Sequence, residues 1–469
     1  MKLTFANKQV LVLGLGDTGL SVLRWLSSHG ATLSVADTRQ APPGLDLLHK
    51  ELPQVKAHLG PFSDEIFAQA ELIVASPGVP LSEPKIQAAL KRGIKVIGDV
   101  ELFAQYKSPS AKVIAITGSN GKSTVTTLVG EMCKAAGLKT MVAGNIGLPV
   151  LDALVQEKVT GVPDVYVLEL SSFQLETTHS LTADVATVLN ISEDHMDRYS
   201  SLADYAGAKM RIFHGAGIQV LNRQDDWSRS MALPGRDVVT FGLDLPPSPA
   251  DFGVMPGSQE SWLMRGSSGL LRTSEMHIPG LHNISNALAA LALCHAIGID
   301  LAPSIIALRN FKGLPHRVEW VAEIEGVTFY DDSKGTNVGA TCAALSGLEP
   351  GSSGAKVVLI AGGDGKGQDF APLREPVAQS ARAVVLIGKD GALIARELSA
   401  VGVPLMHADT LEEAVRVAHS VAKPRDAVLL SPACASFDMF RNYVHRAEVF
   451  VDAVRTLRQE AKHRPGAAA

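Results

Sequence analysis

Residues 113–124 read Val-Ile-Ala-Ile-Thr-Gly-Ser-Asn-Gly-Lys-Ser-Thr, an apolar run that breaks into a turn bounded by two glycines. The run is typical of a buried strand, and a helical pattern over 125–136 begins directly after the turn. Backbone N–H groups at a helix N-terminus attract an anion, and Lys122 adds a full positive charge. The stretch therefore predicts a phosphate-binding loop in which the Ser123 hydroxyl would hold Mg²⁺. A plain strand-to-helix turn that contains glycine is the alternative.

The composition sets the class of protein. The chain of 469 residues is long enough for two to four domains, and its 46% hydrophobic content suffices for several cores. A formal net charge of −5 suggests neither nucleic acid nor a membrane surface as partner, so small molecules are expected. The four cysteines lie far apart without a C-x-x-C pair, which favours a reducing compartment over a disulfide framework or a zinc finger. No apolar run approaches membrane-spanning length and nothing demands an oligomer, so we expect a cytoplasmic monomer without membrane insertion.

The first hundred residues alternate between strand and helix patterns, which predicts an α/β domain. A strand at 9–13 leads into Gly-Leu-Gly-Asp-Thr-Gly at 14–19, and a second strand ends in Asp37 about 20 residues later. This G-x-G-x-x-G pattern is the dinucleotide fingerprint, and alone it would suggest an NAD-linked oxidoreductase. Its physics requires only a diphosphate on a helix N-terminus, so UDP would satisfy it equally. A further strand at 71–75 ends in Ser-Pro-Gly-Val-Pro at 76–80, which is either a ligand-binding edge or loop punctuation.

Polar residues follow the strands that come after the phosphate loop. Glu169 closes an apolar strand, where a carboxylate costs energy unless it binds a cation, so it is a candidate Mg²⁺ ligand or else an acid turned toward solvent. Asn145 lies in a loop with Gly and Pro, where its amide can donate and accept hydrogen bonds. His195 belongs to an acidic cluster at another strand end, which suits a metal near phosphates or, equally, a helix capped by Ser192. Lys209 falls on a helical pattern, where by charge alone it is a surface lysine or one member of an i,i+4 pair.

The C-terminal part repeats the α/β pattern. Strands are predicted at 327–330, 357–360, 383–387 and 427–430. Lys334 follows two acidic residues at the end of the first of these strands, which alone would suggest an ion-paired loop. The run Gly-Gly-Asp-Gly-Lys-Gly at 362–367 is similar to a second phosphate loop, but neither a Ser or Thr nor a long helical pattern follows it.

These motifs resemble, in order, those of the Mur ligases, which are relatives of the folylpolyglutamate synthetases. The phosphate loop departs from G-x-x-x-x-G-K-[ST] at the first glycine, which is Ile116 here, and is similar to the G-[ST]-N-G-K-[ST]-[ST] loop of that family. The resemblance spans nearly the whole chain, with motifs at 118–124, 144–147, 169–175, 190–197, 277–287, 313–317, 331–337, 362–366 and 430–436.

The resemblance implies three α/β domains. A Rossmann-like domain at 1–100 would bind a UDP substrate, a central P-loop ATPase-type domain at 101–313 would bind ATP, and a Rossmann-like C-terminal domain at 314–469 would bind an amino acid. The segment 245–269, rich in Pro, Gly and Ser, matches nothing in the family and is expected to form a surface insertion or an irregular hairpin.

The resemblance also implies a reaction. ATP would phosphorylate the L-alanyl carboxylate of UDP-N-acetylmuramoyl-L-alanine, and the amine of D-glutamate would attack the acyl phosphate, giving an amide, ADP and phosphate. Such a ligase serves peptidoglycan synthesis in the cytoplasm, and so cell-wall biogenesis, cell shape and cell division. The near alternative is a Mur ligase that adds another amino acid, although Lys366 and Ala435-Ser436-Phe437 favour D-glutamate. An NAD-linked oxidoreductase or a non-catalytic nucleotide sensor is the distant alternative.

The family motifs imply roles for individual residues. The catalytic set would be Lys122, Glu169, His195, Lys209 and Lys334. ATP would be bound by Gly118, Ser119, Asn120, Gly121, Lys122, Ser123, Thr124, Asn283, Asn286, Arg317 and Asp332. The UDP-sugar would be bound by Gly14, Gly16, Thr18, Gly19, Asp37, Thr38, Ser76, Pro77, Gly78, Asn145 and His195. D-Glutamate would be bound by Thr336, Lys366, Ser436, Phe437 and Tyr443. Mg²⁺ would be held by Ser123, Glu169, His195 and Lys209, the last as a carbamate because an ammonium would repel the metal.

Overall fold

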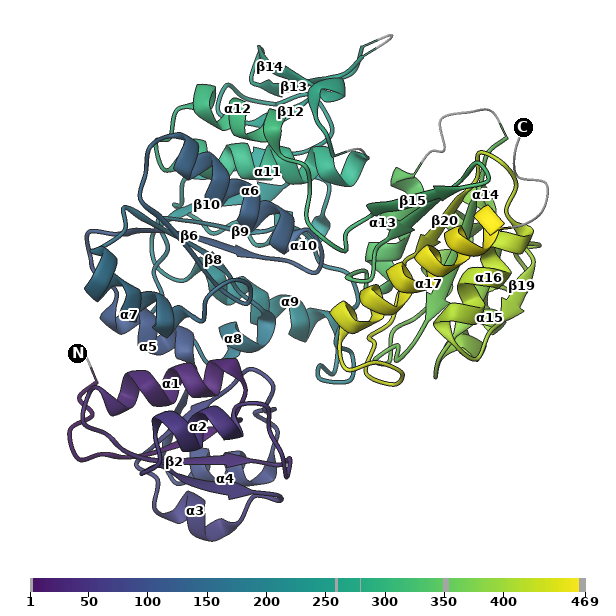
Figure 1. Cartoon of the computed structure of the whole chain (residues 1–469). Helices are drawn as coiled ribbons and strands as arrows, with labels where there is room; N and C mark the ends of the chain where they lie inside the picture. The colour runs from purple at the N-terminus through teal and green to yellow at the C-terminus, as the bar shows by residue number, and fades with distance from the viewer. Residues whose placement is uncertain (1–2, 258–259, 279, 349–353, 464–469) are drawn as a thin grey trace. The chain divides into compact units, whose positions relative to one another are not determined.

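The computed structural model describes residues 3–257, 260–278, 280–348 and 354–463 (Figure 1). The described chain forms two compact units. The first unit holds the residues up to Ile191 together with 203–272 and 287–308, and the second unit holds 192–202, 273–286 and the residues from 309 onward. The motif at 277–287 includes Pro279, which lies outside the described residues.

The first unit opens with a parallel sheet of five strands in the order β3-β2-β1-β4-β5. The strands are β1 (Gln9–Leu13), β2 (Thr32–Asp37), β3 (Lys56–Leu59), β4 (Leu72–Ala75) and β5 (Lys95–Ile97). The helices are α1 (Asp17–Ser27), α2 (Leu45–Glu51), α3 (Asp64–Ala68) and α4 (Pro84–Lys91). β1 lies between β2 and β4, so the strand order reverses there and the carboxyl ends of β1 and β4 form the usual ligand-binding edge of such sheets. The predicted strand at 9–13 is confirmed in full.

A sheet of nine strands follows in the same unit, in the order β14-β13-β12-β11-β10-β9-β6-β8-β7. Its strands are β6 (Lys112–Thr117), β7 (Thr140–Gly144), β8 (Val165–Glu169), β9 (Val185–Val188), β10 (Ile218–Asn222), β11 (Val238–Phe241), β12 (Phe252–Met255), β13 (Trp262–Arg265) and β14 (Ser268–Arg272). The intervening and following helices are α5 (Asp99–Tyr106), α6 (Lys122–Ala135), α7 (Val150–Thr160), α8 (Ser172–Glu176), α9 (Leu202–Met210), α10 (Asp226–Ser230), α11 (Leu281–Ala296) and α12 (Leu301–Asn310), with 3-10 turns at Arg211–Phe213 and Thr273–Glu275.

The phosphate loop emerges from the middle of this sheet. β6 pairs in parallel with β9 and β8, and its residues from Val113 to Thr117 are buried on both faces. The connection from β6 to β7 runs outward across the sheet and the connection from β7 to β8 returns. Because both crossovers are right-handed, α6 and α7 cover opposite faces, as Figure 1 shows.

The segment 245–269 is not a detached surface insertion. β12 continues the sheet in parallel with β11, and β13 and β14 form an irregular antiparallel hairpin at its edge with a register shift at Leu263. Phe252 and Leu263 are fully buried, so the segment contributes to the core. The expectation of an irregular hairpin is therefore partly right, whereas that of an insertion is wrong. Residues 258 and 259 lie outside the described chain.

The second unit contains a six-stranded sheet in the order β15-β16-β20-β17-β18-β19, parallel except for β15. Its strands are β15 (Glu319–Ile324), β16 (Val327–Asp331), β17 (Val357–Gly362), β18 (Ala381–Ile387), β19 (Leu405–His407) and β20 (Ala427–Leu430). Its helices are α13 (Val338–Gly347), α14 (Arg374–Ser380), α15 (Gly391–Leu398), α16 (Leu411–Val421) and α17 (Tyr443–His463), with a 3-10 turn at Ala371–Leu373. Alternate residues of each central strand enter different cores: Val358 and Ile360 pack with α16 and α17, and Val357 and Leu359 pack with α13.

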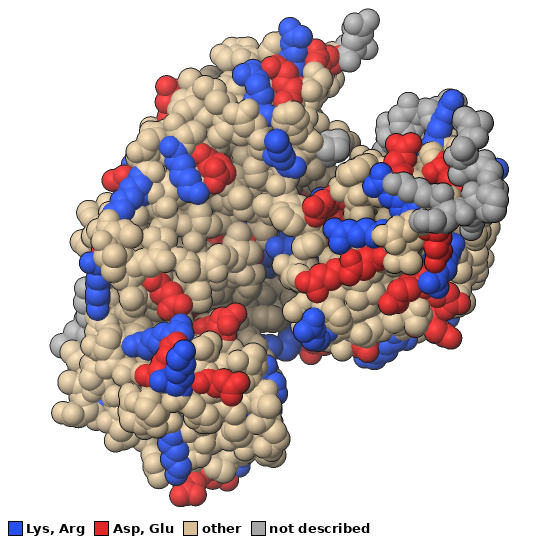
Figure 2. Space-filling model, in the orientation of Figure 1, with Lys and Arg blue, Asp and Glu red and all other residues tan. Residues whose placement is uncertain are grey.

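The surface carries both signs of charge. On the face drawn in Figure 2, Lys and Arg side chains alternate with Asp and Glu. Across the residues described, no helix combines the length and the apolar character that crossing a bilayer requires.

Candidate active site

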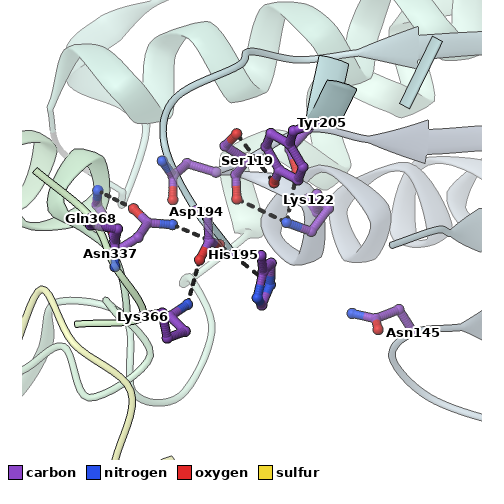
Figure 3. Close-up of polar contacts among 12 residues, drawn as sticks. Ser119, Lys122, Asn145, Asp194, His195, Tyr205, Asn337, Lys366 and Gln368 are labelled. Atoms are coloured by element: carbon purple, nitrogen blue, oxygen red, sulfur yellow. Dashed lines mark hydrogen bonds and ion pairs between the residues drawn. The ribbon is translucent and has the colours of Figure 1, made fainter. Parts of the chain in front are cut away.

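The phosphate loop joins β6 to α6. Gly121 caps the helix with a φ of +83°, a left-handed angle that disfavours a side chain, as the glycine motif predicts. α6 begins at Lys122, earlier than the predicted start at 125, so the Lys-Ser pair lies in its first turn. The Lys122 Nζ donates to the carbonyl oxygens of Gly118 and Ser119 at 2.8 Å each, which holds the ammonium over the loop (Figure 3). This arrangement fits an anion bound at the start of α6.

Two residues outside the loop fix its shape. The backbone N–H of Ser119 donates to the Asn190 carbonyl oxygen at 2.9 Å, and that of Asn120 donates to Asn190 Oδ1 at 2.8 Å. The Asn190 amide returns a hydrogen bond to the Asn120 carbonyl oxygen at 3.1 Å. Ser119 Oγ donates to the Tyr205 hydroxyl at 3.4 Å. Since these two loop amides donate to Asn190, the amides of Gly121 and of the first turn of α6 are the candidates for contact with an anion.

Glu169 stands beside the start of the loop. β8 pairs with β6 so that Glu169 is level with Ile116, and its side chain is only 1% exposed. The solvent-facing interpretation is therefore wrong. Its Oε1 accepts a hydrogen bond from Asn145 Nδ2 at 2.8 Å, while its buried Oε2 has no hydrogen-bond partner among the described residues. A buried carboxylate oxygen left in this state is costly, and a cation would satisfy it.

Lys209 is 1% exposed, so the interpretation as a surface lysine is wrong. Its Nζ donates to the Gly118 carbonyl oxygen at 2.9 Å and to Thr117 Oγ1 at 3.3 Å, and it lies 4.6 Å from the centre of the Tyr205 ring. The helix α9 thus brings Lys209 directly to the end of β6, within reach of the loop that would hold phosphate.

The glycine motif of the first sheet lines a cavity of about 820 Å³. A Cβ at Gly19 would stand 1.9 Å from the Gly14 carbonyl oxygen, so only glycine allows α1 to pack this closely on the turn. Nine of the eleven residues predicted for the UDP-sugar line this cavity: Gly14, Gly16, Thr18, Asp37, Thr38, Ser76, Pro77, Gly78 and Asn145. Gly19 and His195 are not among the lining residues.

Asp37 serves this turn as a structural anchor. Its Oδ2 accepts a hydrogen bond from the Leu15 N–H at 2.7 Å, and Arg39 donates to both of its oxygens at 2.9 and 2.7 Å. Burial acts to raise the pKa of this carboxyl, but the hydrogen bonds from Arg39 and Leu15 hold the pKa below its ordinary value. A uridine contact by Asp37 stays a prediction.

In the second unit, three polar side chains lie near the carboxylate of Asp194. Lys366 Nζ forms a buried ion pair with Asp194 Oδ1, Asn337 Nδ2 donates to Oδ2 at 3.3 Å, and His195 Nε2 lies 3.7 Å from Oδ2 (Figure 3). His195 and Lys366 both take left-handed backbone angles, with φ of +59° and +54°. No helix forms over 192–201, so the interpretation of Ser192 as a helix cap is wrong.

The end of β16 gathers a second polar group in this unit. Asp331 Oδ2 lies 2.7 Å from His316 Nδ1, and Lys334 Nζ lies 5.6 Å from the centre of the Tyr443 ring. Asp332 accepts a hydrogen bond from Ser431 Oγ at 2.7 Å. Burial raises the pKa of Asp332 to about 7, although Ser431 and nearby Arg317 lower it.

Arg317 also influences the start of α11. Burial lowers the pKa of His282 to about 4, and the neighbouring Arg317 adds to this effect. The adjacent Asn283 accepts a hydrogen bond from Asn286 Nδ2 at 3.4 Å. The second unit thus brings together the four residues that the family motifs assign to the nucleotide outside the loop: Asn283, Asn286, Arg317 and Asp332.

Three family descriptions match the chain in succession. "Mur ligase MurD-like, N-terminal domain" matches residues 8–98, "Mur ligase middle domain" matches 116–294, and "Mur ligase, glutamate ligase domain" matches 316–434. The chain is also 65% identical over 458 residues to the UDP-N-acetylmuramoylalanine–D-glutamate ligase of Methylobacillus flagellatus, with 98% of this chain and 99% of the relative covered. The chain belongs to the Mur ligase family.

Other comparisons agree with this membership. The UDP-N-acetylmuramoylalanine–D-glutamate ligase of Thiobacillus denitrificans is 57% identical over 470 residues, with 97% of this chain and 98% of the relative covered. Among solved structures, UDP-N-acetylmuramate-alanine ligase of Thermotoga maritima matches with a TM-score of 0.61 at 20% identity, covering 96% of this chain and 99% of that one. A pseudomurein peptide ligase of Methanothermus fervidus matches with a TM-score of 0.60 at 19% identity, covering 96% of this chain and 100% of that one. The structural likeness confirms the three-domain α/β fold of a Mur ligase.

This Mur ligase offers a donor set that fits a divalent cation beside the phosphate loop. The buried Oε2 of Glu169 has no hydrogen-bond partner among the described residues, and the buried Ser123 lies in the first turn of α6 in the same unit. Carboxylate and hydroxyl oxygens are the ligands that Mg²⁺ prefers. Their chemistry therefore fits the metal that the family resemblance implies.

The residues predicted for D-glutamate differ in burial within the second unit of this Mur ligase. Ser436 is buried, Lys366 is engaged by Asp194, and Thr336 precedes Asn337 at the start of α13. Phe437 is 76% exposed. An exposed phenyl ring at this point can pack against a ligand, which keeps its predicted role open.

The sequence did not predict the residues that support the loops of the site through hydrogen bonds. Arg446, on the C-terminal helix of this Mur ligase, is fully buried and donates to the carbonyl oxygens of Ser333 at 2.8 Å and Cys434 at 3.1 Å. Burial lowers its pKa to about 10. Asn190 and Tyr205 were also missed as supports of the phosphate loop. For Tyr205, the spacing of four residues to Lys209 on one helix was the available signal.

Proposed function

We propose that this Mur ligase is an ATP-dependent enzyme that joins D-glutamate to UDP-N-acetylmuramoyl-L-alanine, a step in the synthesis of peptidoglycan precursors. The observation that carries the proposal is the 65% identity over 98% of the chain to a ligase of that name. The match of residues 316–434 to a glutamate ligase domain supports the choice of amino acid.

The phosphate loop is proposed to catalyse the first half of the reaction. A carboxylate is a poor acyl donor because its leaving group would be an oxide. Transfer of the γ-phosphoryl group of ATP to the L-alanyl carboxylate replaces that group with phosphate and releases ADP. Lys122 and the amides of the first turn of α6 would stabilise the charge that moves onto the leaving oxygen. Asn283, Asn286, Arg317 and Asp332 are proposed to bind the rest of the nucleotide.

Ser123 and Glu169 are proposed to hold Mg²⁺, with Asn145 orienting the Glu169 carboxylate through the hydrogen bond of 2.8 Å. When bound, the ion supplies positive charge that screens the phosphate oxygens. The roles of His195 and of carbamylated Lys209 as ligands of a further ion stay predictions. The burial of Lys209 beside the phosphate loop, with its Nζ 2.9 Å from the Gly118 carbonyl oxygen, supports a role at this site.

The second unit is proposed to bind the amino acid. D-Glutamate brings two carboxylates, and Lys366 with the hydroxyl groups of Thr336 and Ser436 offers donors for them. Phe437 and Tyr443 would supply apolar contact. The amine would then attack the acyl carbon, pass through a tetrahedral intermediate and expel phosphate, which leaves the amide bond.

The Gly14–Gly19 turn and the Ser76–Gly78 turn are proposed to bind the UDP moiety in the cavity of about 820 Å³. We retain the division into a UDP-substrate domain at 1–100, an ATP domain at 101–313 and an amino-acid domain at 314–469. A cytoplasmic location and a monomeric state are likewise proposals.

The test is phosphate release from the purified protein with Mg²⁺-ATP and UDP-N-acetylmuramoyl-L-alanine, with single amino acids supplied in turn as acceptors. Release that depends on D-glutamate is expected. Release with another amino acid would keep the ligase chemistry but contradict the roles of Lys366 and Ser436. No release with any acceptor would overturn the proposed reaction.

A further inference from the structure

Two helices of the first unit contribute residues to the cavity that is proposed to bind the UDP-sugar. α1 follows the Gly14–Gly19 turn, and α7 follows the Gly144–Pro149 loop that carries Asn145. Asp17, Leu20 and Arg24 of α1 line the cavity, as does Asp152 of α7. A shift of one of these helices relative to the other would therefore change the shape of the cavity.

A single carboxylate ties the helices together near the cavity. Ser21 Oγ of α1 donates to Asp152 Oδ1 at 2.8 Å, and Arg24 Nη1 lies 3.9 Å from Asp152 Oδ2. The Ser21 side chain belongs to a residue that is 1% exposed, so its hydroxyl relies on this acceptor. Arg24 is itself fixed by two hydrogen bonds to Glu51 of α2, at 2.6 and 2.9 Å.

The other end of α1 has its own anchor. Trp25 stacks on His29 with ring centres 3.8 Å apart and meets Tyr106 of α5 edge to face at 4.7 Å. Phe5 packs against Trp25 at 5.6 Å. The aromatic cluster holds the C-terminal half of α1, and the contact of Ser21 with Asp152 restrains α1 nearer to the glycine turn.

Asp152 is negatively charged and lines a cavity that is proposed to bind a negatively charged ligand. Four acidic residues line the cavity, Asp17, Asp37, Glu83 and Asp152, and a UDP-sugar brings a negatively charged diphosphate. If Asp152 faced the ligand with its charge unused, it would weaken binding by repulsion. Here Ser21 and Arg24 engage both of its oxygens.

From these contacts we propose that Asp152 is a positioning residue, which fixes the width of the UDP-sugar cavity by tying α7 to α1 through Ser21. The proposal rests on the proposed function, because it names the same cavity. It predicts that the affinity for the UDP-sugar falls when the hydrogen bond between Ser21 and Asp152 is removed, even where the substitution also removes the negative charge of Asp152.

The experiment compares variants that separate the hydrogen bond from the charge. Asp152→Ala and Ser21→Ala both remove the tie, whereas Asp152→Asn removes the charge and keeps an acceptor oxygen for Ser21. The dissociation constant of UDP-N-acetylmuramoyl-L-alanine is measured by titration calorimetry, beside kcat and KM for all three substrates. We expect Asp152→Ala and Ser21→Ala to weaken binding about fivefold to twentyfold, and Asp152→Asn much less. The double variant Ser21→Ala with Asp152→Ala should bind no more weakly than either single variant, since both remove one contact.

The remaining readouts guard against a general loss of structure. KM values for ATP and D-glutamate and the thermal midpoint should stay near those of the wild type, and Asp226→Asn, at an exposed ion pair with Arg229, serves as the control. If Asp152→Ala does not fold, Ser21→Ala carries the test. Tighter binding in both Asp152 variants, with no effect of Ser21→Ala, would mean that Asp152 acts only by repulsion and would overturn the proposal.

Binding measured with the wild-type protein distinguishes failure of the positioning role of Asp152 from failure of the proposed function. Binding of the UDP-sugar by the wild type, with equal affinity in the variants, would overturn the role of Asp152 and leave the proposed function intact. Failure of the wild type to bind the UDP-sugar would overturn the proposed function and the positioning role together.

Discussion

At the scale of the residue, Lys122 carries the sharpest prediction. Its ammonium lies over the phosphate loop, 2.8 Å from each of two loop carbonyl oxygens, where it would meet the transferring phosphoryl group. We expect Lys122→Ala to reduce phosphate release by at least about two to three orders of magnitude, because a preorganised charge is lost. Binding of the UDP-sugar, measured by calorimetry, should be unchanged. Lys134→Ala, at an exposed pair with Glu131 on the same helix, is the control. Turnover near that of the wild type in Lys122→Ala would contradict the role of the loop.

Lys366 allows a second test at the residue scale, because its effect on the stability of the fold and its effect on KM for D-glutamate can be measured separately. Lys366→Met should raise KM for D-glutamate by about tenfold or more and leave KM for ATP unchanged. It should also destabilise the fold, since Asp194 would stay buried without its cation.

The double variant Lys366→Met with Asp194→Asn should recover the stability but not the KM. Lys389→Ala, at an exposed lysine that follows β18, is the matched control. Recovery of KM in the double variant would mean that Lys366 matters to the fold rather than to the substrate.

At the scale of the element, α17 acts through one arginine. Arg446 is fully buried and joins the loop after β16 to the loop after β20 by donating to Ser333 and Cys434. We expect Arg446→Met to destabilise the fold by roughly 3 kcal/mol, because buried carbonyl oxygens lose their donors, and to lower kcat as the loops lose their spacing. Denaturant unfolding and phosphate release measure the two effects.

The matched control for α17 is Arg455→Met, at an exposed ion pair with Asp452 on the same helix, which should change neither quantity. Arg446→Lys should recover part of the stability, since an ammonium can reach only some of the same acceptors. An Arg446→Met variant with normal kcat would contradict the role of α17 in spacing the loops.

The elements differ in how well their sequences predict them. Gln9–Leu13 and Ala427–Leu430 are predicted in full because each is a short buried run bounded by turn residues. The segment 245–269 is predicted to be a surface insertion or an irregular hairpin, since it is rich in Pro, Gly and Ser. The strands β12, β13 and β14 are only four or five residues long each, so they leave little hydrophobic pattern to recognise. Pairing with β11 stabilises these strands, and pairing is a tertiary property.

At the scale of the whole molecule, the candidate site also contains parts that the local sequence predicts and parts that only the fold determines. The phosphate loop and the glycine turn are local motifs, so they can be recognised without a structure. The supports of the loop cannot, because Asn190 and Tyr205 lie 70 and 86 residues along the chain from their partners. Lys209 shows most clearly what the sequence leaves undetermined. A helical pattern does not indicate which face of the helix is covered. A lysine is expected at the surface, but the fold buries Lys209.

The pH dependence of stability is a property of the whole molecule, and Asp99 at the start of α5 should contribute to it. Burial raises the pKa of this carboxyl from 3.8 to about 6, against weaker lowering by backbone N–H groups and Gln174. Between these two values the folded protein keeps a proton that the unfolded chain has released, so the contribution of Asp99 to stability falls as pH rises through this window. Asp99→Asn removes this titration. We therefore expect the variant to be more stable than the wild type at pH 7.5 by roughly 1–3 kcal/mol, and nearly equal at pH 4. Urea unfolding at both pH values measures the difference, with the exposed Asp226→Asn as control. An equal gain at both pH values would show that Asp99 does not titrate in this range.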